Sequence, residues 1–271
     1  MIFGILAFPA SHSLSPAMHN AAFKKMGIDA KYDFFEFPPE KLEEFIQKVR
    51  EEKIEGLSVS IPHKEKIIPL LDEVEESARA IGAVNTIFWK DGKLTGGNTD
   101  WIGALQSLET AQAFEKHGKK VVVLGGGGAA RAIIYALLQE NCEVSVITRE
   151  AWESEGLQKD FGDQIKNFDF IQNLDNHDPD ILVNSTPLGM KGALEGKSFV
   201  DAKWFENHQP LVFDIVYNPR ETQLLKDARA VGCETIEGLN MLVWQGLEQF
   251  KKFTGKEPDL ATMWDAAVAQ L

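Results

Sequence analysis

The amino-acid sequence predicts an α/β protein with two lobes and a cleft between them. Three observations support this fold class. Strand-like apolar segments alternate with amphipathic helical patterns along the chain. A glycine-rich loop joins a strand to a helix at residues 125–130, and a helical tail follows the last strand. The length of 271 residues is enough for two domains of ordinary size.

The first lobe begins with a strand at residues 2–8, a helix at 15–27 that Gly27 stops, and a strand at 30–37. A charged amphipathic helix at 39–53 precedes a third strand at 54–61. Short helices are expected at 64–74 and 75–83. The segment 86–98 is typical of a hairpin that turns at Asp91-Gly92.

The second lobe is expected to start with a helix at 101–118, followed by a strand–loop–helix–strand unit at 119–150. Strands at 180–190 and 210–219 each end in polar or turn residues, and a helix at 222–233 leads to a strand and loop at 234–240. The helical tail needs a surface to pack on, and the first lobe is the natural one. We therefore expect a discontinuous first domain, residues 1–101 plus 241–271, and a second domain at 102–240.

Composition excludes several classes of function. The net charge of −13 disfavours binding to nucleic acid. Two cysteines, Cys142 and Cys233, are too few for a disulfide scaffold or a four-cysteine zinc site, and no His/Cys cluster suggests a metal. There is no apolar run long enough to span a membrane, and the apolar start lacks a basic region. We therefore expect a cytoplasmic protein without metal that acts on a small molecule.

The glycine-rich loop is the strongest local signal. Gly125, Gly127 and Ala130 fit the pattern G-x-G-x-x-A directly after a strand with three consecutive valines. The first glycine permits a tight turn, the second lets the backbone approach a pyrophosphate, and the alanine allows close helix packing. The motif predicts a Rossmann-type dinucleotide-binding domain. The alternative is a tight turn with a purely structural role.

The end of the following strand bears on the choice of cofactor. NAD-specific sites usually place an acidic residue there to bind the ribose 2′-hydroxyl, but this chain has Thr148 and Arg149. Because a guanidinium pairs well with a 2′-phosphate, the sequence favours NADP, with NAD as the alternative. Glu150 would weaken such a phosphate site. A solvated surface role is the other interpretation of Arg149.

Candidate substrate and catalytic groups lie at the ends of first-lobe elements. Ser13 and Ser15 precede a helix, where two hydroxyls and backbone N–H groups suit a carboxylate. Ser15 could equally be an N-cap, with Pro16 at the first helical position. Lys64 follows the third strand, and Asp100 follows the hairpin. A lysine and a carboxylate that meet in a cleft would suit proton transfer at a carbonyl, although a solvated loop lysine is the commoner case.

Together these segments resemble the shikimate dehydrogenase family along the whole chain. The resemblance rests on the ordered motifs SHSLSPAMHN, SVSIPHKE, GAVNT, GNTDWIG, GGGGAARA, NSTPLGM, DIVYNPRET and GLNMLVWQG. It implies that Lys64 and Asp100 are the catalytic pair and that further residues bind the substrate: Ser13, Ser15, Ser60, Asn85, Asp100, Tyr217 and Gln245. The implied dinucleotide contacts are Gly125, Gly126, Gly127, Gly128, Ala129, Thr148, Arg149, Ile215 and Gly238.

The resemblance also implies a reaction, the reversible NADPH-dependent reduction of 3-dehydroshikimate to shikimate. Ser60 stands where many members carry threonine, which leaves the substrate range open, and Thr148 and Glu150 depart from the usual Asn-Arg-Thr pattern. The alternatives are a quinate or dual quinate/shikimate dehydrogenase and a dinucleotide sensor without catalysis. A sensor would have no need of both Lys64 and Asp100. A monomer or a homodimer is expected.

Overall fold

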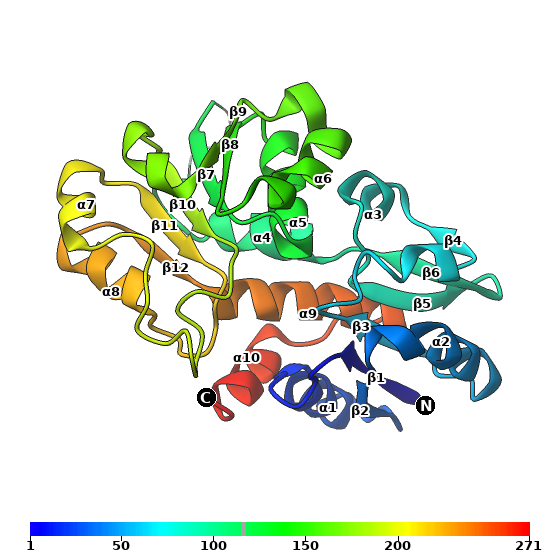
Figure 1. The fold of residues 1–271 in the computed structure, drawn as a ribbon. Helices are drawn as coiled ribbons and strands as arrows, with labels where there is room; N and C mark the ends of the chain where they lie inside the picture. The colour runs from blue at the N-terminus through cyan, green and yellow to red at the C-terminus, as the bar shows by residue number, and fades with distance from the viewer. Residues whose placement is uncertain (115–117) are drawn as a thin grey trace. The chain divides into compact units, whose positions relative to one another are not determined.

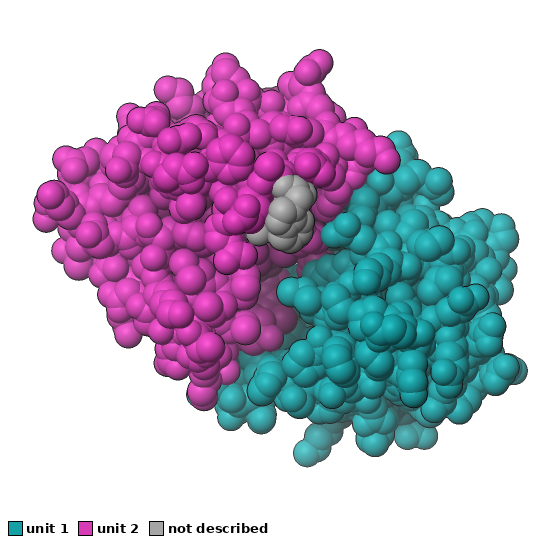
Figure 2. Space-filling model, in the orientation of Figure 1, with its two compact units in different colours: residues 1–99, 243–271 teal, residues 100–242 magenta. Residues whose placement is uncertain are grey.

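The chain folds into two compact units. The computed structural model describes residues 1–114 and 118–271, apart from the side chains of residues 152 and 153. One unit comprises residues 1–99 and 243–271, and the other comprises residues 100–242 (Figures 1 and 2). The second boundary between the two units, between residues 242 and 243, lies inside the long helix α9, Gly238–Thr254.

The first unit is built on a six-stranded mixed sheet in the order β2-β1-β3-β5-β6-β4. Its strands are β1 Ile2–Ala7, β2 Lys31–Glu36, β3 Gly56–Val59, β4 Glu73–Val74, β5 Thr86–Lys90 and β6 Lys93–Gly97. Strand β5 runs antiparallel to both of its neighbours, whereas the β1/β2, β1/β3 and β4/β6 pairs are parallel. The carboxyl ends of β1, β3 and β6 and the amino end of β5 therefore share one edge of the sheet.

The helices of the first unit include a pair from opposite ends of the chain. They are α1 Ser15–Lys25, α2 Leu42–Glu51, α3 Glu76–Ile81, the part of α9 from Val243, and α10 Leu260–Val268, with 3-10 turns at Pro39–Lys41 and Ile68–Leu70. Helix α1 packs against α10. Residues 243–271 belong to this unit together with residues 1–99. Buried residues of α2, including Phe45 and Val49, join Leu57 of β3 in one apolar core.

The hairpin between β5 and β6 forms where the sequence indicates. Asp91 and Gly92 have φ values of 51° and 77°. Two successive positive φ angles are what the favoured two-residue hairpin turn requires, and glycine adopts them without steric cost.

The second unit contains a six-stranded parallel sheet in the order β12-β11-β10-β7-β8-β9. The strands are β7 Lys120–Leu124, β8 Glu143–Thr148, β9 Asn167–Phe170, β10 Ile181–Asn184, β11 Leu211–Asp214 and β12 Thr235–Glu237. The order of strands along the chain reverses between β7 and β10. In open α/β sheets, ligands bind beyond the carboxyl ends of the strands at such a switch point.

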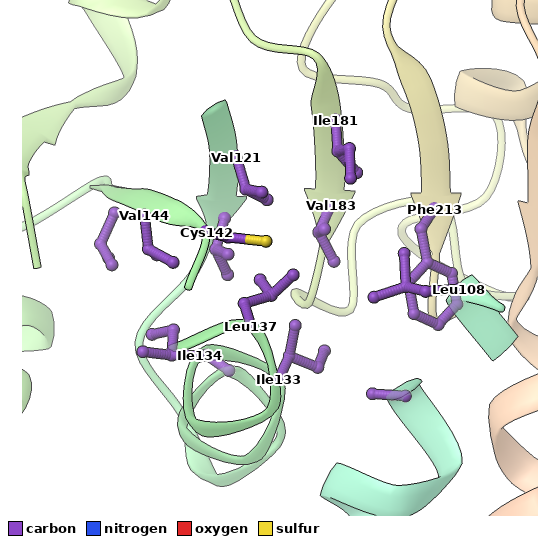
Figure 3. Packing of buried hydrophobic residues seen from close by; sticks show 14 of the residues in the cluster. Leu108, Val121, Ile133, Ile134, Leu137, Cys142, Val144, Ile181, Val183 and Phe213 are labelled. Atoms are coloured by element: carbon purple, nitrogen blue, oxygen red, sulfur yellow. The ribbon is translucent and has the colours of Figure 1, made fainter. Parts of the chain in front are cut away.

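The helices of this unit are α4 Asp100–Leu108, α5 Gly128–Gln139, α6 Ala151–Phe161, α7 Ala202–Asn207 and α8 Gln223–Ala230, with 3-10 turns at Gly162–Gln164 and Ile171–Asn176. Ile133, Ile134 and Leu137 of α5 lie in one buried cluster with Val121 and Val183 of the sheet (Figure 3). The free Cys142 is a buried member of this cluster. Ala130 near the start of α5 and Val123 near the end of β7 belong to the same cluster.

Two expected helices differ from the structure. Residues 64–74 form turns, a 3-10 helix and the short strand β4 instead of an α-helix. The carboxylate of Asp72 accepts the backbone N–H of Leu94 at 2.7 Å and pairs with Arg50, so tertiary pairing at the sheet edge overrides the local helical pattern.

The helix expected at 101–118 ends at Leu108. The carboxylate of Glu234 accepts the N–H groups of Gln112 and Ala113 at 2.8 Å each, which holds this segment out of the helix. Residues 115–117 lie outside the described residues. Within the described part of the chain, no helix is long and apolar enough to cross a membrane.

Candidate active site

The shared edge of the first unit's sheet gathers four chain segments that carry or precede predicted site residues. The loop after β1 carries the two serines, and the turn after β3 carries Ser60 and Lys64. These two segments are tied together, because Ser60 N–H donates to Leu6 O at 2.9 Å and Phe8 N–H donates to Ile61 O at 3.1 Å. Asn85 lies directly before β5, and the segment after β6 leads to Asp100.

The two serines occupy different positions at the start of α1. Helix α1 begins at Ser15, and no side chain caps it, so Ser15 is not the N-cap residue. The Ser13 hydroxyl instead accepts the Ser15 N–H at 3.2 Å. Ser15 is buried and Ser13 is partly exposed. The hydroxyl of Ser15 is therefore not committed to helix capping.

Lys64 lies partly buried in the turn after β3, and its carbonyl accepts Val84 N–H at 2.8 Å. The preceding residue, His63, anchors this turn. It is fully buried, and its Nε2 lies 2.9 Å from Phe37 O, so the neutral ring donates to that carbonyl. Burial lowers the pKa of His63 and keeps it neutral near pH 7. No pattern in the sequence singles out His63 for this role.

Asn85 is the centre of a buried cluster of polar side chains. Its Oδ1 accepts Thr86 Oγ1 and Thr99 N–H, each at 2.7 Å. Its Nδ2 donates to Thr99 Oγ1 at 3.0 Å and to Gln245 Oε1 at 3.4 Å. The structure thus brings together two predicted substrate residues, Asn85 beside β5 and Gln245 in α9. Asp100, directly after Thr99, is buried as the first residue of α4 and of the second unit.

The glycine loop of the second unit has the geometry that a dinucleotide needs. Gly125 has a φ of 108°, and a Cβ there would lie 2.9 Å from Ser185 Oγ and from Thr186 Cγ2. By contrast, a Cβ on Gly127 would meet no atom within 4 Å, so the backbone faces open space. Gly127 is the N-cap of α5. The first N–H groups of a helix have no intrahelical partners, and together with the helix dipole they favour a phosphate.

The predicted ribose-binding residues, Thr148 and Arg149, lie at the carboxyl end of β8. Thr148 is the buried last residue of β8, and its hydroxyl donates to Glu150 O at 3.1 Å. In this structure Thr148 therefore shapes the turn instead of offering its proton outward. Arg149 follows with an exposed side chain, and Glu150 is the exposed N-cap residue of α6.

Two further cofactor candidates meet each other. A Cβ on Gly238 would lie 2.3 Å from the backbone of Ile215, so only glycine allows this approach. Ile215 N–H donates to Asn184 O at 3.0 Å, which links the ends of β10 and β11. Tyr217, two residues further on, is half-buried, and burial raises the pKa of its hydroxyl.

A buried polar network that no sequence motif predicts supports these loops. The carboxylate of Asp214 accepts Asn184 Nδ2 at 2.9 Å, Val216 N–H at 3.1 Å and Thr222 Oγ1 at 2.6 Å. Burial nevertheless raises the pKa of Asp214 to about 6, because three hydrogen bonds do not fully replace water. Both Asn184 and Asp214 end buried strands, and that position was the only available signal.

Across residues 1–114 and 118–271, no three His, Cys, Asp or Glu side chains gather as metal ligands would.

Comparison with protein families shows which known domains these segments resemble. The model described as "Shikimate dehydrogenase substrate binding domain" matches residues 5–87, and "Shikimate 5'-dehydrogenase C-terminal domain" matches residues 238–268. Between them, a "Putative NAD(P)-binding" model matches residues 113–200. The family models therefore cover segments of both units.

Individual relatives match over the whole length. Shikimate dehydrogenase (NADP(+)) of Geobacillus kaustophilus is 39% identical, and the match covers 100% of this chain and 98% of the relative. A crystal structure of a shikimate dehydrogenase with NADP+ has a TM-score of 0.91 at 38% identity, covering 99% of this chain and 94% of that one. The Thermus thermophilus enzyme with NADP(H) and shikimate has a TM-score of 0.88 at 34% identity, with full coverage of both chains.

A relative with a different name also shares this fold. The 5-ketofructose reductase of a Gluconobacter strain has a TM-score of 0.85 at 31% identity and covers 100% of this chain and 99% of that one.

Proposed function

Because this chain belongs to the shikimate dehydrogenase family, we propose that it catalyses the reversible NADP-dependent reduction of 3-dehydroshikimate to shikimate. The observation that carries the proposal is the full-length similarity to enzymes named shikimate dehydrogenase (NADP(+)). The open backbone at Gly127 and the polar cluster around Asn85 supply the two kinds of binding surface that such a reaction needs. The proposed cellular location is the cytoplasm, and a monomer or a homodimer remains the expected state.

The nucleotide-binding unit fits a dinucleotide phosphate. Gly125 to Ala129 would hold the pyrophosphate at the start of α5, and the Ile215–Gly238 contact would border the nicotinamide end. Arg149 is exposed at the end of β8, where a Rossmann-type sheet places the adenosine ribose. In this proposal its guanidinium pairs with the 2′-phosphate of NADP. In the alternative interpretation Arg149 is a solvated surface residue and does not contact the cofactor.

The substrate unit would hold the ring at several points. In this proposal Ser13 and Ser15 receive the carboxylate at the amino end of α1, where the helix dipole favours an anion. The amides of Asn85 and Gln245 bind ring hydroxyls. Ser60 adds a further contact from this unit. Tyr217, which belongs to the nucleotide-binding unit, is the remaining proposed substrate contact.

The proposed chemistry requires one proton donor beside the reacting carbonyl. Bound NADPH supplies the hydride. Lys64 stabilises the negative charge that develops on the carbonyl oxygen and donates the proton to that oxygen. Asp100 orients the ammonium group and a ring hydroxyl. Steady-state turnover then requires Lys64 to regain its proton from solvent.

Three alternative functions make different predictions in one assay. Quinate carries an additional hydroxyl at the carboxylate-bearing carbon, and Ser60 lacks the methyl that threonine would add to the pocket. The similarity to a 5-ketofructose reductase makes 5-ketofructose the second test substrate. A dinucleotide sensor would bind NADP without turning over any of them.

The deciding experiment follows nicotinamide absorbance with shikimate, quinate and 5-ketofructose, each with NADP(H) and NAD(H). We expect the highest kcat/KM for shikimate with NADP and a lower value for quinate, since the serine pair leaves little room for the extra hydroxyl. Equal or better efficiency with quinate or 5-ketofructose would replace the proposed substrate. NADP binding without turnover of any substrate would favour the sensor.

A further inference from the structure

A continuous chain of hydrogen bonds runs through the buried interior of the first unit. Tyr32 OH donates to Ser58 Oγ at 2.5 Å, and Ser58 Oγ donates to Gln249 Oε1 at 2.5 Å. Gln249 Nε2 then donates to Asn85 O at 3.0 Å. All four residues are at most 4% exposed. The chain connects β2, β3, α9 and the residue that precedes β5.

The direction of this chain is determined at one end. A backbone carbonyl is only an acceptor, so Gln249 must turn its amide nitrogen toward Asn85 O. Its amide oxygen then faces Ser58, whose hydroxyl proton is used in that bond. Ser58 Oγ therefore accepts the hydrogen bond that Tyr32 OH donates. Each side chain has one orientation that satisfies its neighbours, and such a network defines its geometry strongly.

The two ends of the chain lie at predicted substrate residues. At one end, Asn85 O accepts both Gln249 and Val59 N–H, the latter at 2.7 Å, while the Asn85 side chain contacts Gln245. At the other end, burial raises the pKa of Tyr32, and the side chains of Ser58 and Ser15 partly offset the rise. Ser15 thus lies beside the phenol that starts the chain.

His19 lies one turn after Ser15 in α1, beside Tyr32 and Gln249 of this hydrogen-bond chain. Residues four apart share a helix face, so His19 lies on the same face as Ser15. Its ring is fully buried and stacks on Tyr32 with centroids 4.4 Å apart and an interplanar angle of 3°. Burial lowers the pKa of His19 to about 3, so the stacked ring is neutral at working pH.

An apolar core would be simpler than this arrangement. A glutamine that is 2% exposed loses its hydration, and an apolar side chain of similar size would avoid that loss. The polar chain does something that apolar packing would not: it fixes directed bonds between α9, β3 and the Asn85 backbone.

We propose that Gln249, oriented by Ser58, is a positioning residue that holds Asn85 and Gln245 in register for the substrate. The inference rests on the proposed function, because it assumes that Asn85 and Gln245 bind the hydroxylated ring. Gln249 itself touches neither substrate nor cofactor in this proposal. It acts through the Asn85 backbone and through its own helix, on which Gln245 lies one turn earlier.

The first test replaces Gln249 with methionine, which keeps the side-chain length and removes both hydrogen-bonding groups. The KM for shikimate should rise about tenfold, the effect of losing about 1.4 kcal/mol of binding. The KM for NADP and kcat should change less than about twofold. Val49→Ala in α2 is the matched control. It opens a cavity in an apolar cluster of the same unit that contains none of the residues of the hydrogen-bond chain. It should lower Tm without moving the KM for shikimate.

The second test uses Gln249→Glu, which tells a directed bond from simple packing. A protonated carboxyl can donate to Asn85 O and accept from Ser58, as the amide does, whereas a carboxylate cannot donate. Burial raises the pKa of such a carboxyl. The KM of Gln249→Glu for shikimate should therefore approach the wild-type value at low pH and rise with pH, relative to the wild type at each pH. Gln249→Met should show no such relative change.

The outcomes separate this inference from the proposed function. If the wild-type enzyme does not turn over shikimate, the proposed function fails. If it does, and folded Gln249→Met and Gln249→Glu both keep the wild-type KM for shikimate at every pH, the positioning role is wrong. If Gln249→Met does not fold, Ser58→Ala takes its place, because it removes a single hydroxyl; an unchanged shikimate KM in that variant would also overturn the proposal.

Discussion

Replacement of Asp214 by asparagine should change how stability depends on pH. Asp214 is 0% exposed, and its pKa is raised from an ordinary 3.8 to about 6. A group with a raised folded-state pKa stabilises the fold fully below its unfolded pKa and loses this contribution as pH rises through its folded pKa. The contribution of Asp214 is therefore present in acid and is lost between about pH 4 and pH 7.

The magnitude follows from these two pKa values. At about pH 5 the carboxyl contributes between about 1 and 2 kcal/mol more to the free energy of unfolding than at about pH 7.5. Asparagine has nearly the same shape and does not titrate. Its Oδ1 can still accept Asn184 Nδ2 and Val216 N–H, but its amide nitrogen would meet Thr222 Oγ1, which must then become an acceptor.

Urea denaturation of wild type and Asp214→Asn at matched pH values is the assay. Other carboxyls, such as Asp72 and Asp169, have lowered pKa values in the folded state, so their protonation in acid destabilises the fold. This effect is the same in the wild type and in Asp214→Asn. The wild type should gain stability relative to the variant as pH falls from about 7.5 to about 5. Asp163→Asn, at an exposed position of the same unit, is the matched control for the loss of one carboxyl group. Parallel stability curves for wild type and Asp214→Asn would refute the reasoning.

The remaining predictions concern the proposed site. Lys64→Ala should lower kcat about 10²- to 10⁴-fold with little change in shikimate affinity, and near wild-type turnover would exclude it as proton donor. Ser13→Ala combined with Ser15→Ala should chiefly raise the KM for shikimate, measured beside an unchanged NADP affinity; no change would leave the pair without a carboxylate role. Arg149→Ala should remove most of the preference for NADP, about one to two decades, while kcat/KM with NAD stays nearly constant. Glu150→Thr should widen that preference, and an equal effect of Arg149→Ala on both cofactors would make Arg149 a surface residue.

Several features were determined by the sequence itself because they depend on neighbours along the chain. Asp91-Gly92 predicts its hairpin from local backbone preferences, and the observed φ angles agree. The Gly125–Ala130 loop, between three valines and an apolar helix, predicts the β7–α5–β8 unit for the same reason. The ordered motifs were enough to identify the family.

Other features were decided by the tertiary structure. Residues 64–74 have a helical pattern, but Asp72 pairs with Arg50 and Leu94 across the sheet edge, and no local preference contains that information. Gln249 lies 164 residues from the carbonyl that it binds, and Asp214 lies 30 residues from Asn184. A buried polar side chain must find its partners among whatever elements the sheet order places beside it. Those partners are therefore set by topology, and periodicity along the chain does not specify them.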